Sequence, residues 1–505
     1  MRSFGDTPFE DKESQPRLKR RDALRLGVLA GGAALVPGCS QVVRRLSAPA
    51  PHAPLEMKAG QADPLIRLLN RVAFGPAPAD LARVAQVGAQ AYIEEQLNPD
   101  EDEDKVLAWR LHGVEVFEFS APDLRDLPQN AILRQMSQSS LLRATYSRHQ
   151  LRERMVDFWS NHFNIYARKW PAAYLKPLDE VQVIRGHALG RFPDLLSASA
   201  HSPAMLSYLD NSSNKRGVPN ENYARELMEL HTLGVYGGYT QKDVHEVARC
   251  LSGWGLEDRF LHRRDTARFD ASQHDDGPKL VLGTRIAPGG GEHDLAQVLE
   301  VLSTHPATAE HLSSKLCQYF LGRDDANCKS RLASIYGSTR GDIRAMLHSL
   351  LLEENLQQAP EILKRPFDFA VSALRVLEAD TDGGWPLQAH LERMGQPLNE
   401  WPQPDGYPSS TSSWSGSLLA RWNFALALCA GQIGGTTLNA SLNLPGQNTP
   451  NGKTIDELTK RILAHRGESL DALALTLRRH ASGASERAWS ETLALLLASP
   501  QFQWR

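Results

Sequence analysis

Acidic, histidine and basic side chains are concentrated at a few places in the chain, and such side chains can bind a metal ion or transfer protons. Residues 219–230 read PNENYARELMEL, and a helix of this sequence turns about 100° per residue. One face of that helix carries Glu221, Arg225, Glu226 and Glu229. Inward carboxylates at this spacing form di-metal sites in helical bundles. The same residues also fit a solvated face braced by Glu–Arg ion pairs at i, i+4, and the spacing alone favours that plainer interpretation.

Two histidines lie in other polar stretches. His162 belongs to the block DFWSNHF, residues 157–163, within an amphipathic helical pattern. A histidine in such a helix is more commonly a hydrogen-bonded core residue than a metal ligand. His274 and Asp275 precede a glycine, and Lys279 follows them. A His–Asp pair in a loop can ligate a metal or transfer a proton, but the sequence DDGP is equally typical of a turn, so both interpretations stay open.

We hypothesise that these stretches converge on one polar pocket that binds a divalent metal ion. The predicted metal ligands are His162, Glu226, Glu229, His274 and Asp275. The surrounding side chains are Glu221, Arg225 and Lys279. The candidate catalytic residues are Glu226, Glu229, His274, Asp275, Arg225 and Lys279. Carboxylate and imidazole ligands suit Zn, Mn or Fe, and a water or O₂ activated by such an ion would make the protein a hydrolytic or oxidative enzyme.

A second hypothesis assigns the protein a non-catalytic role in the cell envelope, where it binds a polymer or an exported partner protein. Residues 383–417 are rich in Pro, Gly and Ser and contain Trp385, Trp401, Tyr407 and Trp414. Disordered segments contain few aromatic residues, and long ordered loops are often functional. The rings would provide stacking surfaces for the ligand. A Ser-His-Asp hydrolase is a weaker third hypothesis, because the chain contains no G-x-S-x-G motif.

The element that must position most of the acidic residues is a helical hairpin over residues 219–254. Asn220 is a candidate N-cap of its first helix, and Gly234 is its predicted end. Thr240 caps the second helix with Asp243 three residues later, a variant of the capping box. Apolar residues then recur at the i, i+3, i+4, i+7 spacing of a core-facing stripe, namely Val244, Val247, Ala248 and Leu251.

Helical periodicity dominates the rest of the chain, and we predict a mainly α fold, a multi-helix globular body. Helical patterns cover residues 63–74, 131–161, 178–206, 294–303, 307–320, 341–353, 367–377, 417–429, 454–463 and 485–497. Strand signals are scarce, and residues 279–282, after turn residues 275–278, predict at most a small β-hairpin. The body is predicted to span residues 62–505, with a subdivision near residues 355–365 left open.

Composition excludes two classes of protein. A net charge of −3 over 505 residues argues against a nucleic-acid-binding protein, which normally carries a basic face. Hydrophobic residues make up 41% of the chain, but no apolar run approaches the roughly 20 residues that a membrane-spanning helix needs. A chain of this length can bury a large core. We therefore expect a soluble globular body.

The first 39 residues have the character of an export signal, because basic residues 17–25 precede the short apolar stretch 26–36. The sequence KRRDALR, residues 19–25, resembles a bacterial twin-arginine signal. The sequence VPGC resembles a lipobox, which would attach a diacylglycerol to Cys39 and so to the membrane. Ordinary cleavage near residues 48–50 is the alternative. Residues 40–61 read as an Ala/Pro linker, and we expect an exported protein of the periplasm or an envelope lipoprotein.

The distinctive blocks of the body together resemble one family. They are RVAFG at 71–75, DFWSNHF at 157–163, AMLSYLDN at 204–211, NENYARELMELHTLGV at 220–235, HDDG at 274–277, HPATA at 305–309, GYP at 406–408 and LASPQF at 497–502. From about residue 62 to the C-terminus the chain resembles the bacterial DUF1800 family, exported proteins without an assigned reaction. The resemblance implies a helical fold and export, and it implies no catalytic residues. Tyr407 stands where that family usually has tryptophan.

Overall fold

The computed structural model describes residues 64–100, 104–259, 262–438, 463 and 486–505. The predicted export signal of residues 1–39, the lipidation site Cys39 and the linker of residues 40–61 lie outside the described residues. Most of the helix predicted at residues 454–463 lies outside them too. The described residues, from 64 to 505 with the gaps given above, belong to one compact unit.

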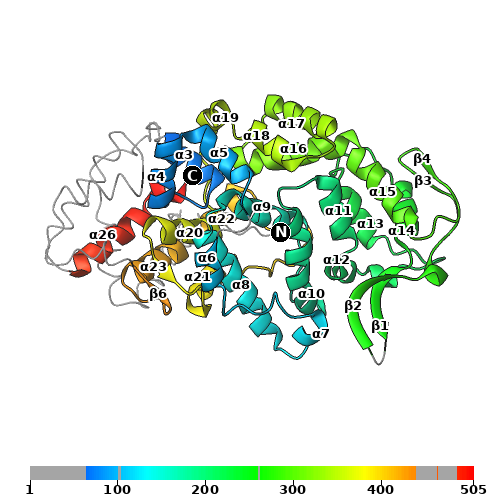
Figure 1. Ribbon diagram of the computed structural model, residues 1–505, viewed down its shortest axis with the longest axis horizontal. Helices are drawn as coiled ribbons and strands as arrows, with labels where there is room; N and C mark the ends of the chain where they lie inside the picture. The colour runs from blue at the N-terminus through cyan, green and yellow to red at the C-terminus, as the bar shows by residue number, and fades with distance from the viewer. Residues whose placement is uncertain (1–63, 101–103, 260–261, 439–462, 464–485) are drawn as a thin grey trace, which may run out of the picture. The chain divides into compact units, whose positions relative to one another are not determined.

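Helices make up most of the described chain, which confirms the predicted mainly α fold (Figure 1). The first half contains α3 (Pro64–Val72), α4 (Pro78–Val87), α5 (Ala89–Leu97), α6 (Lys105–Arg110), α7 (Ala121–Leu124), α8 (Gln129–Tyr146), α9 (Gln150–His162), α10 (Ala172–Asp179), the π-helical η1 (Glu180–Arg185), α11 (Phe192–Ala200), α12 (Pro203–Tyr208), η2 (Asn211–Ser213), α13 (Asn222–Glu229) and α14 (Gln241–Leu251). The second half contains η3 (Ala271–Gln273), α15 (His293–Thr304), α16 (Pro306–Leu321), α17 (Ala326–Thr339), α18 (Ile343–Leu350), α19 (Glu353–Gln358), α20 (Pro366–Val376), α21 (Trp385–Arg393), α22 (Thr411–Trp414), η4 (Ser415–Ser417), α23 (Leu418–Cys429), α26 (Glu486–Ala498) and α27 (Pro500–Gln503).

The strands in the described residues form three separate two-stranded antiparallel sheets. Strands β3 (Lys279–Val281) and β4 (Thr284–Ile286) are the small hairpin expected from the sequence. Strands β1 (Trp254–Arg259) and β2 (His262–Phe269) form a longer hairpin, and β5 (Asp380–Thr381) pairs with β6 (Thr436–Thr437). The β1–β2 hairpin is rich in charged residues, which are poor strand formers, so its sequence carries little strand signal.

Two large groups of buried apolar residues hold the helices together. The first extends along the chain from Leu68 to Ala359 and includes residues of α9, α13, α14, α15 and α16. The second contains residues of α20, α21, α23 and α26, together with Phe74 of the N-terminal region. The core therefore changes near residues 355–365, where the sequence left a subdivision open, but a division into domains stays a prediction.

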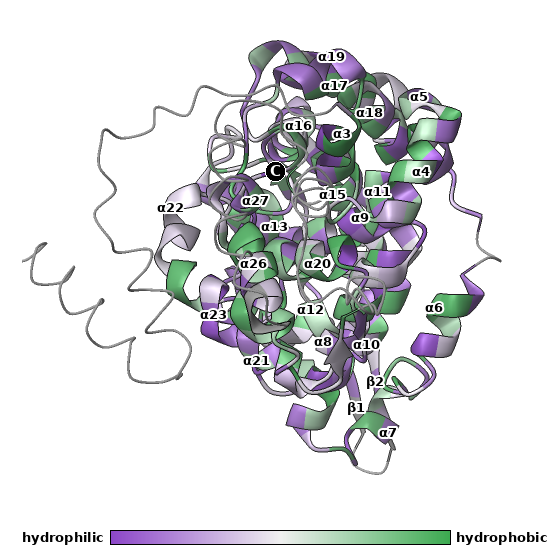
Figure 2. Ribbon diagram, turned by 90° about the vertical axis from the view of Figure 1, so that its left-hand side faces the viewer, coloured by the Kyte–Doolittle hydropathy of each residue, from purple (hydrophilic) through white to green (hydrophobic). Residues whose placement is uncertain are grey.

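Hydropathy explains why the helices pack in this way. Most helices carry hydrophobic and hydrophilic residues side by side, as amphipathic surface helices do (Figure 2). Helix α20 differs, because every one of its residues is buried, including the charged Asp368 and Arg375. Those charges must be matched by partners inside the protein, since water cannot reach them.

The predicted helical hairpin is formed by α13 and α14. The N–H group of Asn222 donates to Oδ1 of Asn220 at 3.0 Å, although Glu221 occupies the N-cap position itself. Thr240 and Asp243 form the predicted capping box: the Asp243 N–H donates to Thr240 Oγ1 at 3.3 Å, and the Thr240 N–H donates to Asp243 Oδ2 at 2.8 Å. The sequence thus predicted the start of α14 correctly.

The capping box gives a prediction for stability. Thr240→Ala is expected to lower the free energy of unfolding by about 1 kcal/mol, because the first turn of α14 loses its side-chain acceptor. Urea denaturation followed by circular dichroism measures the change. Thr240→Ser keeps the oxygen and should unfold close to the wild type, so an equal loss in both variants would contradict the capping role.

Candidate active site

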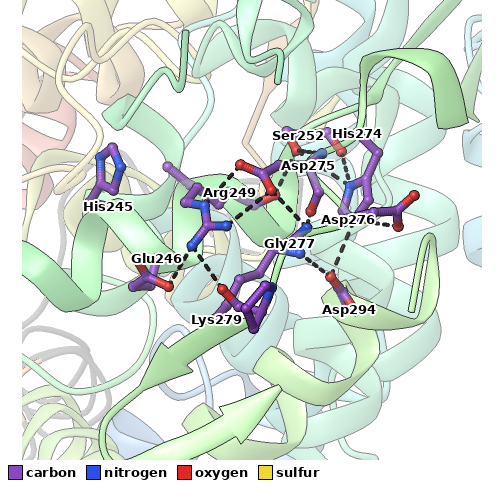
Figure 3. A network of polar contacts seen from close by, with 12 residues as sticks. His245, Glu246, Arg249, Ser252, His274, Asp275, Asp276, Gly277, Lys279 and Asp294 are labelled. Atoms are coloured by element: carbon purple, nitrogen blue, oxygen red, sulfur yellow. Dashed lines mark hydrogen bonds and ion pairs between the residues drawn. The ribbon is translucent and has the colours of Figure 1, made fainter. Parts of the chain in front are cut away.

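Arg249 of α14 organises one of the two polar groups that contain predicted site residues (Figure 3). Its Nε and Nη2 donate to the Asp275 carboxylate at 2.9 and 3.0 Å, and its Nη1 donates to Glu246 at 2.9 Å. The hydrogen bonds from Arg249 lower the pKa of Asp275 to about 2, although partial burial opposes the shift. Asp275 is therefore a fixed anion that anchors the 274–278 turn to α14.

Beside this pair, Asp294 of α15 is buried with two hydrogen-bond donors, Lys279 and His274 (Figure 3). Its Oδ2 accepts a hydrogen bond from Lys279 Nζ at 2.5 Å and one from His274 Nε2 at 3.2 Å. His274 Nδ1 donates to the backbone carbonyl of Ser252 at 2.7 Å, so both ring nitrogens are in use. The side chains of His274, Lys279 and Asp294 are 0% exposed, which suits an internal anchor better than a site that substrate reaches.

The acidic face of α13 is partly an ion-paired surface. Arg225 lies 3.3 Å from Glu221 at the i, i+4 spacing, which confirms the plainer interpretation for that pair. Glu229 accepts a hydrogen bond from the Tyr239 hydroxyl at 3.0 Å. Burial and the nearby Glu229 raise the pKa of Glu226. Glu226 is thus the member of this face that differs from an ordinary surface carboxylate.

The structure does not bring the five predicted metal ligands together as one group. The hydrogen bonds of His162 go to Lys315 and His231, whereas those of His274 go to Ser252 and Asp294. Within the described chain, no set of three or more His, Cys, Asp or Glu side chains is arranged to hold a metal ion. The reason is that the 274–278 turn is anchored to α14 and α15, while α9 places His162 against α16.

A second polar group, which we call the His–Lys cluster, consists of His162, His231, His311 and Lys315. Lys315 Nζ of α16 donates to His162 Nδ1 of α9 at 2.8 Å, and His162 Nε2 donates to the His231 carbonyl at 3.1 Å. The ring of His162 lies 6.1 Å from that of His231 and 6.3 Å from that of His311, measured between centroids. The cluster joins two of the distinctive sequence blocks, residues 157–163 and 220–235, with side chains of α16.

The hydrogen bonds fix the protonation of the rings in the cluster. His162 must accept at Nδ1 and donate at Nε2, so it is a neutral imidazole with its proton on Nε2. His311 Nε2 donates to the Leu230 carbonyl at 3.2 Å. The ring of His231 is 1% exposed, and neither of its nitrogens has a partner among the described residues. A buried imidazole in this state can bond to a water or to a substrate group.

Burial and mutual repulsion set the charges of the cluster. Burial, with Lys315 nearby, lowers the pKa of His231 to about 3 and that of His311 to about 4, and it holds the pKa of His162 well below its usual range. Burial also lowers the pKa of Lys315 to about 8, against the opposing attraction of Asp405. At neutral pH the three rings are neutral, and Lys315 is the group whose charge changes closest to pH 7.

The residues around the cluster include one predicted site residue. Glu226 lies near enough to act electrostatically on Tyr208, and the two carboxylates Glu226 and Asp405 add to burial in raising the pKa of Tyr208. Asp405 also acts on both Lys315 and Glu226. Asp405 therefore links Lys315 electrostatically to Glu226 and Tyr208.

Sequence reasoning found His162, but Lys315, His311 and His231 were not among the predicted site residues. A signal for Lys315 and His311 exists, because they are four residues apart and share one face of α16. His305 caps the start of α16, because its Nδ1 accepts the Ala307 N–H at 3.2 Å.

The aromatic loop is packed against α9 instead of forming an open surface. Trp401 and Tyr407 lie 4.9 Å apart, and Tyr407 and Trp414 lie 6.1 Å apart, between ring centroids. The Asn161 amide donates to the Tyr407 carbonyl, and the Asn164 amide donates to the carbonyls of the loop at 401 and 403. These contacts use the loop to cover α9 and leave its central rings little free surface for a polymer.

The fold and the two polar groups define a mainly α globular protein with a buried histidine–lysine centre. The chain belongs to the family described as "Protein of unknown function (DUF1800)", whose model matches residues 67–504. This match confirms the resemblance read from the sequence. Comparison with curated proteins and with solved structures found no match. Among the described residues, no helix combines the length and the apolar character needed to cross a membrane.

Proposed function

We propose that the protein is an exported enzyme that uses the His–Lys cluster for proton transfer, with hydrolysis as its reaction class. The observation that carries this proposal is the 2.8 Å hydrogen bond from Lys315 to the neutral His162 within the partly buried cluster. An amine whose pKa is about 8 is roughly one-tenth neutral at pH 7 and can accept a proton. The twin-arginine and lipobox patterns of residues 19–39 support export to the envelope.

The contacts suggest how the proton moves. A neutral Lys315 amine can keep one N–H on His162 Nδ1, which leaves its lone pair free to take a proton from a bound water. The unpartnered ring nitrogens of His231 supply hydrogen-bonding positions for that water or for the polar group under attack. The water, once deprotonated, becomes the nucleophile, and Lys315 returns the proton to the leaving group.

An activity screen with matched variants tests the role of Lys315. Nitrophenyl esters, phosphates and glycosides are incubated with the wild type, with Lys315→Met, and with the surface control Lys329→Met. We expect one substrate class to be hydrolysed with a rate that rises with pH through a midpoint near 8, since the neutral amine is the active form. Lys315→Met should lose on the order of 100-fold in rate, and the control should retain it.

Two outcomes would overturn the proposal. One is an activity that Lys315→Met retains in full, because the amine would then take no part in the reaction. The other is the absence of turnover for all three substrate classes with folded wild-type protein. A pH profile unaffected by removing the amine would point to Glu226 as the titrating group instead.

A further inference from the structure

The face of α9 opposite His162 lines a half-open cavity of about 70 Å³ that the proposed reaction does not use. The cavity and the His–Lys cluster lie on different faces of α9, since the cavity residues of α9 lie about half a helical turn away from His162. Its other walls come from α10, η1 and the segment near residue 398, and they include the apolar rings of Phe74 and Phe367. The cavity thus combines an apolar wall with several ionisable side chains.

Each carboxylate that lines this cavity already has a cationic partner. Arg185 lies 2.9 Å from Glu153 and 3.1 Å from Glu180. Asp157 is paired with Arg365 at 2.5 Å and accepts a hydrogen bond from the Tyr319 hydroxyl at 2.6 Å. The acidic groups of the cavity are therefore neutralised by the protein itself.

Lys176 is the charged residue of the cavity wall that lacks such a partner. It is 3% exposed, and no hydrogen bond or ion pair of its ammonium group is formed with any described residue. Its neighbour Asp179 is bonded to the Ser202 hydroxyl at 2.6 Å. Burial lowers the pKa of Lys176, and the charges of Asp179 and Glu180 only partly oppose this. A buried amine that lacks a partner is unfavourable unless an acceptor or anion joins it.

We propose that this cavity binds a small organic carboxylate, whose charged end pairs with Lys176 and whose apolar part lies against Phe74 and Phe367. One unpaired cation matches a single negative charge, and Arg185 is already occupied by two glutamates, so a phosphate would lack further cations. The rings favour a ligand with a hydrocarbon portion. The cavity would then provide a binding site separate from the His–Lys cluster.

Calorimetric titration of the full chain with matched probe pairs tests the site. The probes are butyrate and phenylacetate, each compared with its neutral amide, butyramide and phenylacetamide. We expect at least one carboxylate to bind about tenfold or more tightly than its amide, the ratio typical of losing one charged hydrogen bond. Lys176→Met keeps an apolar chain of similar length and should abolish this preference, whereas Lys329→Met should leave it intact.

The comparison of carboxylate and amide binding is made with the wild-type protein, so it does not require that the Lys176→Met variant folds. Equal binding of carboxylate and amide would overturn the proposal, and so would the absence of binding by both carboxylates. Unchanged carboxylate binding by a folded Lys176→Met protein would overturn it as well. None of these results bears on the hydrolytic role of Lys315, because the nitrophenyl screen is read out at the other face of α9.

Discussion

Asp294→Ala is expected to lower the free energy of unfolding by about 3–5 kcal/mol, because it leaves the buried Lys279 ammonium group without its anion and the His274 ring without its acceptor. Lys279 Nζ lies 2.5 Å from the Asp294 carboxylate, and the His274 ring lies 3.2 Å from it. All three side chains are fully buried, so water cannot replace the lost carboxylate. Chemical denaturation of the purified variant and wild type measures the difference.

The neighbouring Asp276 provides the matched control for this prediction. Its side chain is 55% exposed and lies 3.9 Å from the His274 ring, so Asp276→Ala should change stability by less than about 0.5 kcal/mol. The double variant Asp294→Leu/Lys279→Met removes the carboxylate together with the ammonium group that pairs with it, and it should recover part of the loss. A loss below about 1 kcal/mol for Asp294→Ala would contradict the anchoring role, and the group would again be a candidate for catalysis.

The helical hairpin was predictable because its signals are local. Thr240 and Asp243 cap the start of α14, and the apolar stripe that begins at Val244 faces the core. These signals lie close together along the chain, so the sequence alone reveals them. The β1–β2 hairpin was not predictable in this way. Its strands are stabilised by cross-strand pairs such as Trp254 and Phe269, whose ring centroids lie 5.5 Å apart, and the residues next to each of them in sequence do not encode this pairing.

The candidate site was only partly predictable from the sequence. Two residues that are neighbours in the chain can point in different directions and bond to different partners. His274 and Asp275 are neighbours in the chain, yet one bonds to Asp294 and the other to Arg249. A side chain's partner depends on which element packs above it, and this is set by the whole fold. Sequence patterns therefore identified the polar stretches but assigned the wrong partners to them.

The His–Lys cluster was also hard to predict from the sequence, because its residues are far apart along the chain and meet only in the fold. His162 and Lys315 are separated by 153 residues, and only the packing of α9 on α16 places their nitrogens 2.8 Å apart. The pKa of Lys315 is lowered by burial, and the burial of this side chain could not be predicted from the sequence alone. The distinctive blocks were the useful signal, since two of them, residues 157–163 and 220–235, meet at this cluster.

Asp368→Ala is expected to destabilise the fold by about 3–5 kcal/mol, because Asp368 of the buried helix α20 neutralises two arginines. Its carboxylate is paired with Arg154, which is 0% exposed, and accepts a hydrogen bond from Arg365 Nε at 2.9 Å. Removing the carboxylate leaves Arg154 without its ion pair in the core. Thermal and urea unfolding measure the loss, and Asp324→Ala, which removes a 43%-exposed partner of Lys329, should change stability by less than about 0.5 kcal/mol.

The same carboxylate makes stability depend on acid pH. Burial alone would raise the pKa of Asp368, but Arg365 and Arg154 outweigh it and lower the pKa from 3.8 to about 2. A depressed carboxylate pKa means that the unfolded chain binds the proton more readily, so the stabilisation is complete above about pH 4 and is lost as the pH falls towards 2. In Asp368→Asn this part of the pH dependence should disappear. A wild type and an Asp368→Asn variant that lose stability in parallel between pH 4 and pH 2 would show that other carboxylates control acid unfolding.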